Sequence, residues 1–365
     1  MKFMFLKSYI GQRISSELRF ALIATGLLLS LAACNLSRPA SPPTASTPTK
    51  TIPSQNLSRS NLIGLLFVKK DNRNNEFRGE IYPIALLLND RYLEVSNDVT
   101  QAIRNGGSRD RILQINDQRI VTNAIKDFTI VSNHQKLGEF QVKKPVVSQF
   151  TCSAVITGQG NLQSQSSLPT IFEQLSPAGG FTGSIGQQTF DETWRSTIAI
   201  SQAPTLAKLS APSEADLARY RQAALTFGKA AIAKVANAGK VNGEASVESI
   251  QVVDLDQDGS PEIFSKVKQG SPANATQSLN PICFAAVWFS YRAGQPQLLE
   301  ITQASVSLSG SQRFPYDLLE TIDINHDGIQ EAIVKRTGYE STSFEIYEYK
   351  NNQLDRVFQG AGYGC

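Results

Sequence analysis

The sequence contains few of the residues from which most catalytic sites are built. Its 365 residues include two histidines, His134 and His326, and four cysteines. Two histidines are too few for a multi-histidine zinc site, and a Ser-His-Asp triad would have to recruit one of them. No glycine-rich phosphate loop follows a strand and opens a helix, so nucleotide binding has no support. We therefore expect that the chain is not an enzyme.

Long apolar runs are also missing, except at the N-terminus. Residues 20–33 are almost unbroken apolar sequence behind a basic leader. A membrane-spanning helix needs about 20 apolar residues, so this shorter run fits a signal-peptide core better. It ends in Leu31-Ala32-Ala33-Cys34, which resembles the lipobox of bacterial lipoproteins. The resemblance implies that residues 1–33 are removed and that Cys34 carries lipid; the alternative is an ordinary signal peptide before a chance cysteine.

The chain after the leader has no excess of either charge. Residues 1–33 hold four basic residues and one acidic residue, so the 35 Lys/Arg and 32 Asp/Glu of the whole chain both fall to 31. Nucleic acid is bound largely through an excess of Lys and Arg, so we expect no nucleic-acid partner. No later segment is apolar over a sufficient length to span a bilayer, which leaves the lipid on Cys34 as the expected membrane anchor.

Three further cysteines remain, Cys152, Cys283 and Cys365. None has metal-ligand spacing to another. An oxidising compartment would allow one disulfide and leave one thiol. We expect Cys283 and Cys365 to pair, because both belong to the C-terminal region.

Composition divides the chain into segments. Residues 34–60 are rich in Pro, Ser and Thr, which predicts an extended tether. Residues 61–205 contain short β-type runs between polar breaks and predict a β-rich domain of unknown type. The expected strands are residues 62–68, 84–88, 111–115, 128–131, 140–143, 146–156 and 193–200.

One amphipathic helix is expected within residues 206–240. Pro212 fits a first-turn position, and Ser213 with Asp216 provides a cap. Apolar residues then recur at steps of three and four, which makes one apolar face for packing on the C-terminal sheet. The residues of that face are Leu217, Tyr220, Ala224, Phe227, Ala231 and Val235.

An aspartate-rich pattern occurs twice in residues 241–365. Residues 254–262 and 323–331 both read D-x-[DN]-x-D-G-x-x-E. In each copy β-type runs enter and leave the pattern, so each reads as the turn of a β-hairpin. A single Asp-rich turn arises by chance, because turns favour Asp, Asn and Gly, and an empty polar turn is therefore the alternative. Two copies in register favour a common ligand instead.

The pattern has the chemistry of a calcium site. Ca²⁺ takes six to eight oxygen ligands, and positions one, three and five of a tight loop can aim side-chain oxygens at one centre. The glycine at six permits the turn, the carbonyl of residue seven adds an oxygen, and the carboxylate at nine closes the site. Mg²⁺ fits less well, because it dehydrates reluctantly. The predicted ligands are Asp254, Asp256, Asp258, the Ser260 carbonyl and Glu262 in one loop, and Asp323, Asn325, Asp327, the Ile329 carbonyl and Glu331 in the other.

The loops are not EF-hands, because Ser265 and Val334 stand where an EF-hand has its bidentate Glu. Strand, Asp-rich loop and strand instead resemble the calcium-binding repeat of the FG-GAP and VCBS type, over about residues 245–365. Position nine is Glu where Asp is commoner, and the Gly-Ala-Pro signature is missing.

A second hairpin follows each loop, so each unit has about four strands, the size of a propeller blade. The expected fold is mainly β, with an N-terminal β-rich domain, one amphipathic helix and two such units.

These features predict a lipid-anchored envelope protein whose calcium-stabilised β domain binds a protein or glycan partner or has a structural role. The alternative is an envelope hydrolase with its active site in residues 61–205, which predicts a deep pocket with converging polar groups there. An assembly factor for another envelope complex makes no distinct prediction. Asn35 beside Cys34 lacks the Asp that retains some lipoproteins at the inner membrane, which favours the outer membrane in a Gram-negative source.

Overall fold

The computed structural model confirms a mainly β fold, with 61% strand and 19% helix among the residues that it describes. The predicted leader, tether, Cys34, Cys152 and Cys365 lie outside the described residues, so the predictions for them stay predictions. None of the helices in the described part combines the length and apolar character needed to cross a bilayer. The described residues are 60–71, 76–95, 98–116, 121–150, 153–163, 167–177, 184–185, 188–189, 194–206, 211–235, 243–270, 282–307, 316–338 and 341–364.

The N-terminal sheet is antiparallel and its strand pairings form a closed circuit. β2 and β6 close the circuit through only three residue pairs, one of which is Gly79 with Gly160. A side-chain carbon at Gly79 would lie 2.4 Å from the Phe140 ring, so glycine permits the close approach at this junction. The circuit runs through β1 (Asn61–Asp71), β2 (Glu76–Leu88), β6 (Ser153–Gln163), β5 (Gln135–Phe150), β4 (Asp127–Ser132) and β10 (Trp194–Ile200).

Short strands and short helices flank this sheet. One of them corrects the sequence-based prediction, because residues 111–115 are helical and not a strand. They belong to α3 (Arg109–Asn116), where the Arg111 N–H donates to the Ser108 hydroxyl at 3.3 Å and Ile112 packs into a buried cluster with β5 and β6. The capping serine was the local signal for this helix. The other short elements are β3 (Arg91–Glu94), α2 (Thr100–Arg104), α4 (Val121–Ala124), α5 (Leu168–Gln174), β7 (Ser176–Pro177), β8 (Ser184–Ile185) and β9 (Gln188–Thr189).

The C-terminal part forms two four-stranded antiparallel sheets, as predicted. In both, the strands pair in the order in which they follow one another along the chain. The first C-terminal sheet consists of β11 (Ala245–Val253), β12 (Glu262–Gln269), β13 (Ile282–Arg292) and β14 (Gln295–Ser307). The second C-terminal sheet consists of β15 (Tyr316–Ile322), β16 (Glu331–Thr337), β17 (Ser341–Lys350) and β18 (Gln353–Gly364).

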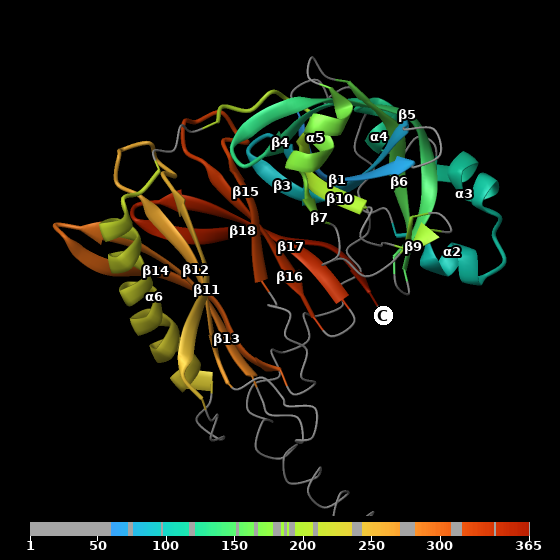
Figure 1. Ribbon diagram of the computed structural model, residues 1–365. Helices are drawn as coiled ribbons and strands as arrows, with labels where there is room; N and C mark the ends of the chain where they lie inside the picture. The colour runs from blue at the N-terminus through green and yellow to red at the C-terminus, as the bar shows by residue number, and fades with distance from the viewer. Residues whose placement is uncertain are drawn as a thin grey trace, which may run out of the picture.

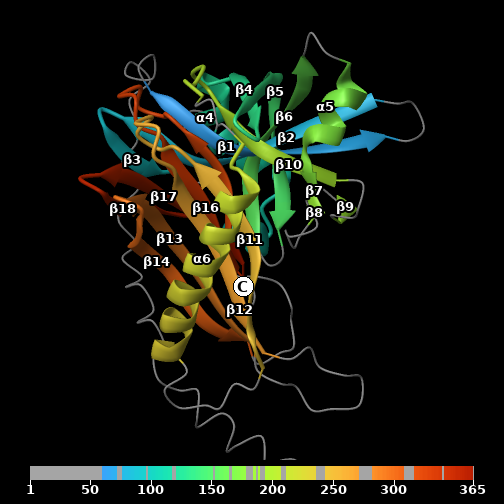
Figure 2. The same ribbon diagram turned by 60° about the vertical axis from the view of Figure 1, so that its left-hand side comes forward.

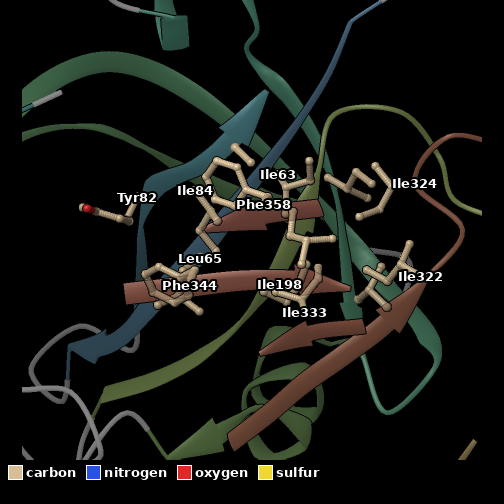
Figure 3. Close-up of a cluster of buried hydrophobic side chains, with 14 of the residues drawn as sticks. Ile63, Leu65, Tyr82, Ile84, Ile198, Ile322, Ile324, Ile333, Phe344 and Phe358 are labelled. Atoms are coloured by element: carbon tan, nitrogen blue, oxygen red, sulfur yellow. The ribbon is translucent and has the colours of Figure 1, made fainter. Parts of the chain in front are cut away.

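The sheets are stacked in layers, and both faces of each C-terminal sheet are buried (Figures 1 and 2). Successive side chains of a strand point to opposite faces, so β13 turns Val287 and Phe289 toward helix α6 (Glu214–Val235) and Trp288 toward the second C-terminal sheet. The second C-terminal sheet uses its other face to contact the N-terminal sheet. Figure 3 shows that shared core, with Ile63, Leu65, Tyr82, Ile84 and Ile198 on one side and Ile322, Ile324, Ile333, Phe344 and Phe358 on the other.

Helix α6 and the N-terminal sheet therefore cover the two ends of a two-sheet stack. Each repeat of a stacked protein needs a neighbour on either face, and terminal units need a covering layer. Two blade-sized units are too few for a closed ring, and the structure shows what takes the place of further units. Asp317 adds a polar tie within the stack, since its carboxylate contacts Lys266 of the first sheet and Lys335 of its own sheet at 2.8 Å each.

Helix α6 lies very close to the first C-terminal sheet at Gly228. The Asp216 N–H donates to Ser213 at 3.1 Å, which confirms the predicted cap, and Tyr220, Ala224 and Ala231 of the predicted face are buried. A side-chain carbon at Gly228 would lie 2.6 Å from the Cβ atom of Val267. The helix therefore needs glycine here for space, although glycine weakens a helix interior.

We expect Gly228→Ala to destabilise the protein, although alanine has the higher helix propensity. Overpacking of this kind costs about 1–3 kcal/mol, and chemical denaturation measures it. Lys229→Ala, on the exposed side of the same turn, is the control and should stay within about 0.5 kcal/mol of the parent. A Gly228→Ala protein more stable than the parent would show that the helix can move away from β12 without loss.

Candidate metal centres in two aspartate-rich loops

Both Asp-rich segments are tips of β-hairpins. Residues 254–262 join β11 to β12, and residues 323–331 join β15 to β16, with antiparallel pairing on either side. The two loops share an unusual backbone. Positions four and six are left-handed in both, with φ of 56° at Gln257 and 85° at Gly259, and 62° at His326 and 89° at Gly328. Nothing lies within 4 Å of where a side-chain carbon would be on either glycine, so these glycines serve the backbone angle and not close packing.

Four side-chain contacts recur at matched positions of the two loops. The carboxylate at position one accepts the N–H of position six, and the side chain at three accepts the N–H of five. The carboxylate at five accepts the N–H of seven, and the glutamate at nine accepts the N–H of two. In loop order the pairs are Asp254–Gly259 (3.1 Å), Asp256–Asp258 (3.3 Å), Asp258–Ser260 (2.6 Å) and Glu262–Leu255 (2.8 Å), then Asp323–Gly328 (3.2 Å), Asn325–Asp327 (3.0 Å), Asp327–Ile329 (2.8 Å) and Glu331–Ile324 (2.7 Å).

These contacts leave oxygen atoms without a protein donor. One oxygen of Asp254 and one of Asp323 are buried and have no hydrogen-bond partner among the described residues. Asp323 is only 2% exposed, so its unpartnered oxygen is shielded from bulk water. In the first loop, one oxygen each of Asp254, Asp256 and Glu262 lies within 4.8 Å of the others. Buried oxygens without a donor are costly, and a cation placed among them would offset that cost.

The electrostatics of the loops would also favour a nearby cation. Burial, together with the charges of Asp256 and Asp254, raises the pKa of Glu262 to about 8 against the opposing hydrogen bond from Leu255. Burial likewise raises the pKa of Glu331 to about 8, with the charge of Asp327 as a further cause. Each loop therefore holds a buried glutamate that disfavours its charged form unless a cation lies nearby.

Each repeat holds its predicted side-chain ligands at one hairpin tip, but among the described residues only Asp254, Asp256 and Glu262 of the first loop place three oxygens within 4.8 Å of one another. Asp258 and Asp327, at position five, are exposed, whereas Glu262 and Glu331 are buried at the base of their loops. The Asn325 amide also donates to Asp327 at 3.0 Å. His326 is exposed, and the other histidine, His134, lies away from the loop tips, with its ring nitrogen 3.0 Å from Glu320.

The two loops also contact each other, and a residue outside the two patterns contacts the second loop; no local pattern in the sequence indicated these contacts. The Gln330 N–H of the second loop donates to the Leu255 carbonyl of the first at 2.7 Å, and the Gln257 side chain donates to the Gly328 carbonyl at 3.0 Å. Asn61, the first residue of β1, donates from its side-chain amide to the Ile324 carbonyl at 2.9 Å.

A tyrosine from the next layer lies beside the position-nine glutamate of each loop. Tyr349 of β17 faces the first loop, and burial together with the charge of Glu262 raises its pKa to about 12. Tyr92 of β3 faces the second loop, and burial together with the charge of Glu331 raises its pKa as well. The two loops thus share their surroundings as well as their internal contacts.

The N-terminal sheet contains a pocket of about 640 Å³. Its rim carries the cations of Arg78, Lys143 and Lys144, and no carboxylate, histidine, serine or cysteine is among its lining residues. Lysine is the one residue type in this lining that can act as a nucleophile or a general base. The remaining lining residues are Phe77, Gln159, Gly160, Asn161, Leu162 and Leu168.

One polar cluster of the N-terminal sheet lies away from that pocket. The Glu80 carboxylate accepts hydrogen bonds from Ser148 and Thr157, and all three side chains are buried. A serine beside a carboxylate could suggest a nucleophile, but Ser148 is 0% exposed and cannot meet a substrate in this conformation. The cluster therefore contributes to the interior of the sheet and not to a reactive surface.

The chain was compared with protein-family models, curated proteins and solved structures. No family model matches it, and neither a curated protein nor a solved structure does.

Proposed function

We propose that each of the two Asp-rich loops binds one calcium ion and that the ions stabilise the stacked C-terminal sheets. The observation that carries this proposal is the unpartnered, buried carboxylate oxygen at position one of both loops. Around it the loops supply carboxylate and amide oxygens from positions three, five and nine. A hard cation with many oxygen ligands suits this set better than a metal that prefers nitrogen or sulfur.

Calcium fits better than magnesium because of how the loops are built. Magnesium demands a compact octahedron and retains several waters, whereas calcium accepts six to eight oxygens in flexible geometry. The two loops differ in charge, since Asn325 replaces the carboxylate that Asp256 provides. Ligand charge tunes calcium affinity. The first loop, with four carboxylates, is therefore expected to bind more tightly than the second, with three.

The wider proposal is a lipid-anchored envelope protein. Cys34 would carry the lipid, and residues 34–60 would hold the folded part away from the membrane surface. The calcium-ordered sheets would then bind a protein or glycan partner or act structurally, without catalysis. The lipobox-like segment and the tether composition support this reading.

Calorimetric titration of the delipidated chain with CaCl₂ tests calcium binding directly. We expect two binding events in the parent, one in Asp254→Ala, one in Asp323→Ala and none in the double variant. MgCl₂ at the same concentration should give much weaker heat, and Asp355→Ala, an exposed aspartate on β18, should titrate like the parent. A folded parent that binds no calcium at millimolar concentration would reject the proposal.

A further inference from the structure

The second loop receives one of its stabilising contacts from the N-terminal sheet and not from another Asp-rich loop. Position two of each loop has a carbonyl that points to the next layer of the stack. In the first loop this is the Leu255 carbonyl, which accepts from the backbone of the second loop at Gln330. In the second loop it is the Ile324 carbonyl, and no third Asp-rich loop follows. The Asn61 amide takes that place, from 263 residues earlier in the chain.

Position two connects this contact to the proposed metal ligands. The Ile324 N–H donates to Glu331 at 2.7 Å, and Ile324 directly follows Asp323. Asn61 therefore binds the residue that carries one ligand and orients another. A second contact reaches the same place, because Thr205 forms a β-bridge with Asp323 itself. The first residue of β1 and the segment that follows β10 thus both contact the second loop.

Asn61 is held firmly enough to act as a fixed support. It is 2% exposed, and its side-chain oxygen accepts the Gln202 N–H at 3.1 Å and the Ser201 hydroxyl at 3.2 Å. The oxygen and the nitrogen of its side-chain amide thereby bond to different layers. The oxygen bonds within the N-terminal sheet, and the nitrogen bonds to the second loop. Loss of the Asn61 side chain would leave the Ile324 carbonyl without its donor.

We propose that the second loop is a composite calcium site, in which Asn61 positions the ligands Asp323 and Glu331, so that calcium binding and docking of the N-terminal sheet stabilise each other. This inference rests on the proposed calcium function. Coupling between two binding events is reciprocal, so whatever docking contributes to calcium affinity, calcium contributes equally to docking. The first loop lacks this contact and serves as an internal reference.

Single-site proteins separate the two loops. Asp254→Ala retains the second site, and Asp323→Ala retains the first. We expect Asn61→Ala to weaken calcium binding about fivefold to tenfold at the second site, the effect of one lost hydrogen bond, and less than twofold at the first. Calorimetric titration with CaCl₂ measures both. Ser201→Ala is the matched control, because it also contacts Asn61 but leaves the bond to Ile324 in place.

Each outcome bears on a different claim. An equal loss at both sites would mean general destabilisation and would overturn the composite site. An unchanged second site would also overturn it, while calcium binding itself would stand. Absence of binding in both single-site parents would instead reject the proposed function.

Hydrogen exchange provides a second measurement if Asn61→Ala does not fold. The Gln202 N–H donates to the Asn61 side chain, so its exchange reports how firmly Asn61 is held beside the second loop. In the Asp254→Ala protein, saturating calcium should slow exchange of this N–H about fivefold to tenfold, the reciprocal of the affinity change. In the Asp323→Ala protein calcium should slow it less than twofold. Equal protection in the two proteins would overturn the inference.

Discussion

Removal of calcium is expected to lower the free energy of unfolding by about 5 kcal/mol. A ligand that binds only the folded state, at 100 times its dissociation constant, adds about 2.7 kcal/mol for each site. A change of this size lowers the melting temperature by on the order of 10 °C in a chain of this length. The physical reason is that unpartnered carboxylate oxygens and the buried glutamates Glu262 and Glu331 lose their compensating charge. Thermal denaturation with CaCl₂ and with chelator measures it.

An isosteric variant should change the melting temperature in opposite directions in calcium and in chelator. In calcium, Asp323→Asn should remove about half of the effect, because one site is lost. In chelator the same variant should melt at or above the parent, since it removes a buried negative charge that has no cation. Asp355→Asn, at an exposed position, should change neither condition. A parent that melts equally with calcium and with chelator would contradict the prediction.

Between pH 5 and pH 8 the N-terminal sheet is expected to lose about 3 kcal/mol of stability through Glu80. Burial raises the pKa of Glu80 from 4.5 to about 7, against the opposing hydrogen bonds from Ser148 and Thr157. The folded state therefore keeps a proton that the unfolded state has released. The stabilisation is complete below pH 4.5 and is lost as the pH rises through 7. Each unit of pKa difference corresponds to about 1.4 kcal/mol.

Glu80→Gln tests this pH dependence. The amide has the size of the protonated acid and stays neutral, so the variant should be up to about 3 kcal/mol more stable than the parent at pH 8 and similar to it at pH 4.5. Denaturation is measured in saturating calcium, so that Glu262 and Glu331 stay charged throughout. Glu139→Gln is the control, because Glu139 lies on β5 with its side chain 59% exposed. A stability difference between Glu80→Gln and the parent that is constant with pH would show that Glu80 does not titrate in this range.

The stack gives the two proposed metal sites unequal surroundings. Among the described residues, the first loop is contacted from the second C-terminal sheet, through Gln330 and Tyr349. The second loop lies between the first loop and the N-terminal sheet, which contributes Asn61 and Tyr92. A tether leading into Asn61 would therefore meet the folded part beside the second site. Calcium would stabilise the junction at which the anchored end of the chain enters the fold.

The sequence alone determined features whose causes are local. Two copies of D-x-[DN]-x-D-G-x-x-E between β-type runs predicted two hairpin tips, and the pairings on either side of residues 254–262 and 323–331 agree with that. The glycine at position six was predicted to permit the tight turn, and its positive φ in both loops is the physical reason. Helix α6 was predicted from its period and its capping serine. Such patterns act over about ten residues and can therefore be recognised in the sequence.

Tertiary structure decided everything that depends on contacts between distant segments. Residues 111–115 look like a strand by composition, yet a serine cap and burial of Ile112 against β5 and β6 make them helical. Asn61 gave no sign of a role in a loop 263 residues away. Burial of Glu80 depends on three strands meeting on one face. Side chains acquire these environments only when the layers stack, because burial and long-range hydrogen bonding are properties of the assembled core and not of any local pattern.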